Sequence, residues 1–386
     1  KAPAPDALGV QAKNRRYLSK GIQSAARWTW GQKWLHTIEL GVRYHFDQED
    51  RFQWVDRYAF INNEMVMTTA GHRGTDANRI NSAQALSHHI LYTAKFGGLT
   101  LTPGLRMEQM NLKRLDYGKL DPDRVGNDAS RRNNRLTVWI PGIGANYRFN
   151  NMIQAFGGVH KGFAPPSTTP GQKAESSINY ELGTRFDFDG LQGEVVGYYN
   201  DYQNLLGSDL SATGGTGSLD QYNAGAVRVS GIELGLNYDV LQGQENDVHW
   251  PLALTYTLTD SEFLTSFDSS ESIYGIVRRG DVIPYIPKNQ LALAFGYERL
   301  RWAINLNVRH RSGFRTLAGS GAMDPSLTVD PNVVVDASAF YSVCPGLKLT
   351  ANVLNLFDQV YAVSRTPAGL RPGHPFGLNI AIGYQW

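Results

Sequence analysis

Hydrophobic and polar residues alternate along most of the chain, and the alternation extends to its end. In the final ten residues, GLNIAIGYQW, apolar side chains occupy every second position from Leu378 to Trp386. A period of two residues predicts a β-strand with one apolar and one polar face. Chain ends usually fray, so a strand that runs to the last residue indicates that this end is held in a sheet.

Internal stretches repeat the pattern and show what lies on the polar face. The segments HTIELGVRYHF (36–46) and WAINLNVR (302–309) alternate in the same way. Charged residues such as Glu39, Arg43 and His45 would be costly in a dry core, but they suit a hydrated interior. We therefore expect Glu39, Arg43, Asn305 and Asn307 to face water or an enclosed domain, and Leu40, Val42, Ile304 and Leu306 to face lipid.

About fifteen strands follow from this pattern, and their connections alternate between short turns and long loops. The expected strands lie near residues 20–30, 34–46, 86–96, 99–112, 135–149, 152–161, 178–188, 191–202, 228–240, 249–261, 290–298, 301–312, 333–344, 347–357 and 376–386. Short turns at one rim and long loops at the other are typical of bacterial outer-membrane barrels. Sandwiches and propellers do not require that alternation. The expected fold is an all-β, transmembrane antiparallel β-barrel.

The order of the connections also predicts an orientation. With the C-terminus at the periplasmic rim, the long loops are extracellular, and residues 1–19 form the segment through which the chain enters from outside. Residues 20–386 then form barrel wall. Single-chain barrels normally have an even strand count, so an odd count favours a chain that lacks the front of its barrel. The alternative is a further strand within residues 1–19.

Composition and charge exclude several other classes. The 386 residues have a formal net charge of +2, which gives no global bias toward nucleic acid. The sequence contains no run of eighteen apolar residues, so it predicts no transmembrane helix. The lone Cys344 cannot form an intrachain disulfide. His88 and His89 point to opposite faces of a strand, so they make a poor metal pair. Although spacing alone leaves a hydrolytic barrel open, no constellation supports one, and we expect neither an enzyme nor a bound metal or cofactor.

Several motifs in the second half of the chain resemble those of TonB-dependent outer-membrane receptors. NVLNLFDQVY (352–361), the Pro-Gly-His-Pro segment after it and the final aromatic residue resemble the C-terminal signature of that family. HKGFAPPS (160–167), INYELGTRF (178–186) and VSGIELGLNY (229–238) resemble family elements in the family's order. Segments 284–298 and 14–28 look most like the ferric dicitrate branch.

This resemblance implies more than the pattern does. A complete receptor of the family has a barrel of about 22 strands around an N-terminal plug domain that binds the TonB–ExbB–ExbD complex. The chain would then be the C-terminal part of such a barrel, without its plug. Its partners would be the plug and remaining strands, on the same chain or a separate one, together with lipopolysaccharide and outer-membrane lipid. The implied function is uptake of a ferric siderophore or a citrate-like anionic chelate; a passive diffusion porin and a structural or adhesin barrel are the alternatives.

Arginines in the long loops are candidates for binding such a ligand. Guanidinium groups are planar, permanently charged and able to bind carboxylates in a bidentate manner. Resemblance to the dicitrate branch favours a substrate-binding set in or beside the outer loops, consisting of Arg16, Arg73, Arg79, Gln221 and Arg365. Loop arginines can equally bind lipopolysaccharide phosphates or remain solvated. The pattern does not decide which of them converge on one ligand.

Overall fold

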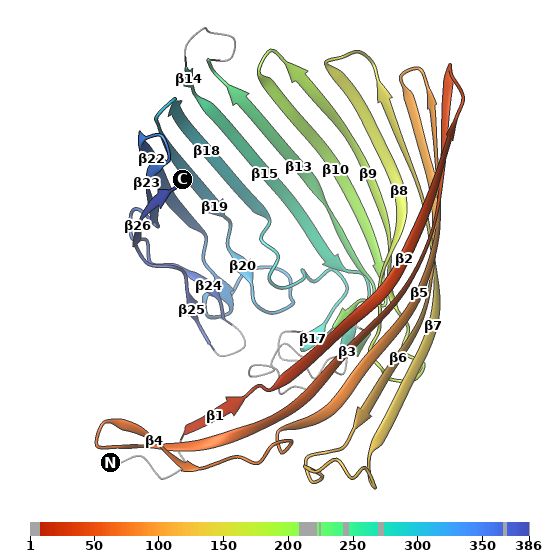
Figure 1. Cartoon of the computed structure of the whole chain (residues 1–386), viewed down its shortest axis with the longest axis vertical. Helices are drawn as coiled ribbons and strands as arrows, with labels where there is room; N and C mark the ends of the chain where they lie inside the picture. Colours follow the sequence, from red (N-terminus) through yellow and green to blue (C-terminus); the bar gives the residue numbers. More distant parts are fainter. Residues whose placement is uncertain are drawn as a thin grey trace.

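The computed structural model describes residues 8–207, 222–223, 225–241, 247–268, 274–365 and 369–385. Gln221 and Trp386 therefore lie outside the described residues. The described part of the chain contains no helix long and apolar enough to cross a membrane. Its strands form one large curved antiparallel sheet, with four small two-stranded sheets in the long loops (Figure 1).

Fifteen long strands build the large sheet within the described residues. They are β2 (Arg15–Trp30), β3 (Trp34–Ile61), β5 (Ala77–Phe96), β6 (Leu99–Asp116), β7 (Ser130–Arg148), β8 (Ile153–Ala164), β9 (Glu175–Phe188), β10 (Leu191–Gln203), β13 (Val227–Asp239), β15 (Pro251–Phe263), β18 (Asn289–Arg299), β19 (Trp302–Arg311), β22 (Asn332–Cys344), β23 (Leu347–Leu354) and β26 (Gly377–Tyr384). Each predicted strand is confirmed by one of these. Shorter strands β1 (Leu8–Ala12), β4 (Glu64–Thr69) and β14 (Val248–His249) extend the sheet.

Each long strand pairs with the next one along the chain, and every pairing is antiparallel. Of the long strands, β2 pairs only with β3 and β26 only with β23 in the described part of the chain. Figure 1 shows the result as a curved sheet whose first and last strands lie apart. Strands β2 and β26 are therefore the two edges of the sheet in the described part of the chain and do not pair with each other.

The register divides the sheet into two continuous faces. Directly paired residues of antiparallel strands lie on the same face, so pairing can be followed from Glu39 through Leu91, Gly104 and Gly142 across the whole sheet. We call the face that carries Glu39 the polar face and the other the apolar face. Glu39, Arg43, Asn305 and Asn307 share the polar face, and Leu40, Val42, Ile304 and Leu306 share the apolar one. The predicted division of these eight side chains is confirmed.

Aromatic side chains form a belt on the apolar face beside the short turns. Neighbouring rings are in contact, with centroid separations of 5.6 Å for Trp34–Phe96, 4.8 Å for Tyr147–Phe149 and 5.1 Å for Tyr297–Trp302. Amphipathic rings of this kind concentrate at membrane–water interfaces. The belt therefore indicates the level at which the short-turn rim leaves the bilayer.

The other membrane boundary can be read on β3, whose apolar face changes character after Phe46. Seven consecutive apolar-face positions carry Trp34, His36, Ile38, Leu40, Val42, Tyr44 and Phe46. Gln48 and Asp50 follow on the same face, and such groups are costly in hydrocarbon. At about 3.4 Å per residue and a tilt near 45°, this span matches a bilayer. The remainder of β3 therefore projects beyond the membrane.

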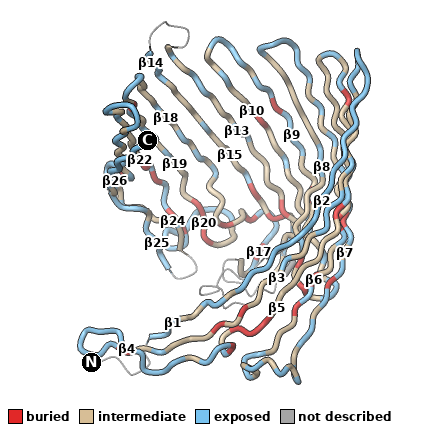
Figure 2. Tube along the Cα trace, viewed as in Figure 1, coloured by how far each residue is buried: buried red, intermediate tan, exposed pale blue. Residues whose placement is uncertain are grey.

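This projection differs from the loop expected at 47–85. There β3 continues to Ile61, β4 pairs with it, and β5 begins at Ala77. Strand β1 also pairs with β3, at the edge that β2 occupies nearer the short turns, so it prolongs β2 without adding a strand to the wall. Figure 2 shows buried residues mainly towards this long-loop end, while most of the sheet is exposed or intermediate.

Candidate ligand-binding site

Five arginines gather on the polar face at the long-loop end. Arg15, Arg51 and Arg79 are directly opposite one another on β2, β3 and β5. In the neighbouring row, Arg114 of β6 pairs with Arg132 of β7. We call these five residues the arginine cluster. Like charges placed opposite one another destabilise a sheet, so the sequence maintains this arrangement at an energetic cost.

Glu49 and Asn81 hold part of the cluster in place. The Glu49 carboxylate lies 2.8 Å from Arg51 Nε and 3.8 Å from Arg15 Nη1. Asn81 donates to Glu49 at 3.3 Å and accepts from Arg114 Nε at 3.0 Å. Burial raises the pKa of Glu49, but the hydrogen bond and charge of Arg51 outweigh it, and the pKa is lowered overall. Glu49 is therefore an ionised counter-charge.

Arg79 is the most electrostatically strained member of the cluster. Its side chain is buried, with 9% of its surface exposed. Burial lowers the pKa of Arg79, and the charges of Arg114 and Arg51 lower it further, against the opposing effect of Asp116. Among the described residues, Glu49 and Asp116 are the carboxylates that the register places directly opposite or beside the cluster on the polar face. An anion entering from the long-loop side would relieve this repulsion.

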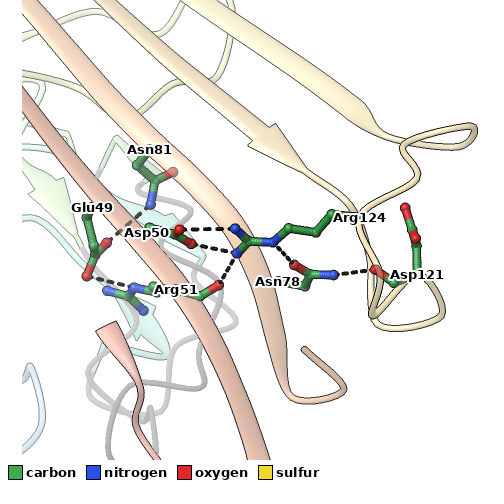
Figure 3. A network of polar contacts seen from close by, with 7 residues as sticks. All are labelled: Glu49, Asp50, Arg51, Asn78, Asn81, Asp121 and Arg124. Carbon is green, nitrogen blue, oxygen red and sulfur yellow. Dashed lines mark hydrogen bonds and ion pairs between the residues drawn. The ribbon is translucent and has the colours of Figure 1, made fainter. Parts of the chain in front are cut away.

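A second polar network lies directly behind, on the apolar face above the membrane boundary (Figure 3). Arg124 donates to both oxygens of Asp50, at 2.5 and 3.0 Å, and to Asn78 Oδ1 at 2.8 Å. Its guanidinium also lies 4.4 Å from the centroid of the Phe52 ring. Asn78 in turn donates to the Asp121 carbonyl at 2.6 Å. The β6–β7 loop is thus fixed against β3 and β5, which holds the strands that carry the arginine cluster.

The structure brings only one of the five predicted ligand residues into this cluster. Arg79 is a member. Arg16 pairs with Asp50 in register and so lies on the opposite face, and Arg73 stacks on Trp54, also on that face, at 5.4 Å. Arg365 donates to the Thr328 and Pro325 carbonyls at 2.6 and 3.2 Å, which ties two long loops together. Gln221 lies outside the described residues.

Reasoning from the sequence missed the other four arginines of the cluster. A signal was present, because apolar residues return to the apolar parity at Phe52 and Trp54 after the polar Gln48 and Asp50, with Arg51 on the polar parity. Extending the strand past the membrane boundary to include Phe52 and Trp54 would have placed Arg51 on the same face as Glu39.

Comparisons with known proteins agree with this architecture. The family described as TonB dependent receptor-like, beta-barrel matches residues 5–356. The ferrienterobactin receptor of Escherichia coli (strain K12) is 28% identical over 202 residues, which cover 48% of this chain and 24% of that protein. The vitamin B12 transporter BtuB of Vibrio vulnificus is 23% identical over 323 residues, covering 75% of this chain and 47% of that protein.

Among solved structures, the unliganded ferric citrate transporter FecA superposes with a TM-score of 0.74 at 18% identity. The match covers 97% of this chain and 55% of FecA, and at that identity it shows the fold alone. The chain spans about half the length of FecA and, at most, about half of the two curated relatives above.

The family match covers most of the chain, and the protein belongs to the TonB-dependent receptor β-barrel family. This is a family of bacterial outer-membrane receptors, and its matched relatives are named as receptors and transporters. The passive-porin alternative is not supported by these matches.

Proposed function

We propose that the protein takes part in TonB-dependent uptake of an anionic ferric chelate across the outer membrane. The observation that carries this proposal is the arginine cluster, which places five arginine residues on the polar face of the sheet at the long-loop end. Carboxylates bind guanidinium groups in a bidentate manner, so a citrate-like chelate matches the cluster in charge and geometry. We expect Arg79 to be the central ligand residue of the arginine cluster. The ligand roles of Arg16, Arg73, Gln221 and Arg365 remain predictions.

The remaining parts of the transport system are proposed on the same basis. A plug and further barrel strands of the same receptor, on this or a separate chain, would fill and close the wall. The plug would connect it to TonB–ExbB–ExbD, while lipopolysaccharide and lipid would surround the apolar face. The chain then contributes barrel wall and outer loops, without catalysis.

Loss of the Arg79 charge is expected to weaken binding of the chelate. A hydrogen bond to a charged group contributes about 1.5–3 kcal/mol, so Arg79→Gln should raise the Kd for ferric citrate roughly tenfold to a hundredfold. The weaker binding should appear as a higher ferric citrate concentration at half-maximal uptake, measured with radioactive ferric citrate in intact cells that express the receptor. Arg131→Gln is the matched control, because Arg131 lies beside Arg132 on β7 but on the apolar face, and it is exposed.

A neutral ferric chelate tests the role of charge separately. Its uptake should be the same with Arg79→Gln and with Arg131→Gln. Equal uptake of ferric citrate by these two variants would contradict the proposal.

Labelling of single cysteines tests the proposed orientation. Gly190 and Gly346 lie in short turns, each with a positive φ, and Asp268 and Ser320 lie in the long loops of the opposite rim. A membrane-impermeant maleimide added to intact cells should modify Ser320→Cys but not Gly190→Cys. Cys344 is replaced by serine beforehand, since it is exposed. The reverse pattern of labelling would invert the orientation.

A further inference from the structure

A second polar pocket lies in the other half of the sheet, separated from the arginine cluster by β8, β9, β10 and β13. It is a cavity of about 440 Å³ on the polar face of β15, β18, β19 and β22. The register places Thr257, Gln290, Arg311 and Asn332 in one row across these strands. Tyr361 and Val363, beside and within β24 (Ala362–Ser364), line the cavity from the long loop above.

Arg311 brings an uncompensated positive charge to this row. Its Nη2 donates to the Ala362 carbonyl at 3.0 Å, and the guanidinium lies 4.7 Å from the centroid of the Phe314 ring. No carboxylate is among the described side chains that line the cavity. The neighbouring Arg309 differs, because its Nη2 contacts Asp336 at 2.5 Å. Arg309 also lines the pocket, but Asp336 balances its charge, so Arg311 is the lining cation that no described carboxylate of the pocket neutralises.

Two buried N–H donors in the pocket have no acceptor among the described residues. They are Nε of Arg311 and Nδ2 of Asn332, and the Asn332 side chain is more than nine-tenths buried, with 9% of the residue exposed. A buried donor without a partner carries its full cost of desolvation. Two such donors in adjacent positions of one row, one of them on a cation, define a place for an acceptor that carries negative charge.

We propose that this row binds a carboxylate group of a small-molecule ligand. One carboxylate oxygen accepts from Arg311 Nε and the other from Asn332 Nδ2, since these residues are opposite each other in the β19–β22 register. Thr257 and Gln290 continue the row with further groups that can donate hydrogen bonds. The site is a second anion subsite, independent of the arginine cluster. It does not rest on the function proposed above, because its evidence comes from other strands.

Chemical modification of arginine in the wild-type receptor in detergent tests the subsite directly. Phenylglyoxal modifies accessible guanidinium groups, and peptide mass spectrometry reports the rate at each arginine. Millimolar citrate is expected to slow modification of Arg311 severalfold and to leave Arg301, an exposed residue in the β18–β19 turn, unchanged. Modification of Arg311 at the same rate with and without citrate would overturn the proposal.

Two variants and a second anion sharpen the result. Asn332→Asp keeps the shape of the side chain but places a carboxylate beside Arg311, so citrate should no longer protect. Arg79→Gln should leave the protection at Arg311 intact, which separates this proposal from the fate of the arginine cluster. Equal protection of Arg311 by inorganic phosphate at the same concentration would overturn the assignment to a carboxylate.

Discussion

Arginine in place of Leu306 is expected to lower the free energy of unfolding of the receptor by about 2–4 kcal/mol, the range for a cation near the bilayer midplane on a lipid-facing strand position. Leu306 lies midway along β19 on the apolar face, and 39% of its surface is exposed in the chain. The substitution therefore exchanges a contact with lipid for a buried charge that no nearby group of the apolar face can neutralise.

Arginine in place of Asn305 is the matched control. Asn305 is the preceding residue of the same strand, and its side chain lies on the polar face opposite Gly296 and Ser338. There the guanidinium remains in a polar, hydrated interior, so the cost should be much smaller. Each variant is refolded into phosphocholine bilayers and titrated with the denaturant guanidinium chloride, which gives the difference in free energy of unfolding. Equal costs for the two variants would rule out a hydrated interior.

The sequence predicted the wall well because the two faces of each strand meet different media. Lipid on one side and water or protein on the other impose a strict period of two, which remains visible when the strand length is uncertain. The turn chemistry was also readable. In NLFDQVY, Asn355 and Asp358 are of the residue types that favour turns, and both have positive φ. The Asn355 side chain bonds to the Gln359 and His374 backbones at 2.9 Å.

Strand ends at the long-loop rim were predicted less well, for a physical reason. The expected strands were given the length needed to cross a bilayer, but pairing between β3 and β5 continues above the membrane as far as Gln53 and Ala77. Beyond the boundary, polar residues such as Gln48 and Asp50 appear on the apolar face. They indicate that the strand has left lipid, not that it has ended.

The arginine cluster could not be predicted as a set from residue spacing. Its members lie at positions 15, 51, 79, 114 and 132, on five different strands. Only the pairing register decides that Arg51 is opposite Arg15 and Arg79, and a shift of one residue would place it opposite neither. Arg16 illustrates the same point, since one position along the strand moves a guanidinium from the polar face to the apolar one.

The two outer strands of the sheet run in the same direction. All fourteen pairings between consecutive long strands are antiparallel, so the first and the fifteenth strand, β2 and β26, are parallel to each other. They cannot close an antiparallel barrel against one another. Each leaves a row of backbone N–H and C=O groups unpaired within the described residues, and in hydrocarbon every such group costs several kcal/mol.

The purified 386-residue chain is therefore not expected to form a heat-resistant barrel by itself, whereas coexpression with the proposed N-terminal strands and plug should restore one. Electrophoresis with and without boiling measures this, because closed barrels migrate differently until they are heated.

Disulfide crosslinking of paired cysteines gives a second readout. In chains that carry Cys344→Ser, Ala26→Cys of β2 and Ala381→Cys of β26 should not crosslink in the assembled receptor. A control pair on β22 and β23, Ala339→Cys with Ala351→Cys, should crosslink, since these residues are directly opposite. A heat-resistant band from the chain alone, or an efficient crosslink between β2 and β26, would show that the sheet closes without further strands.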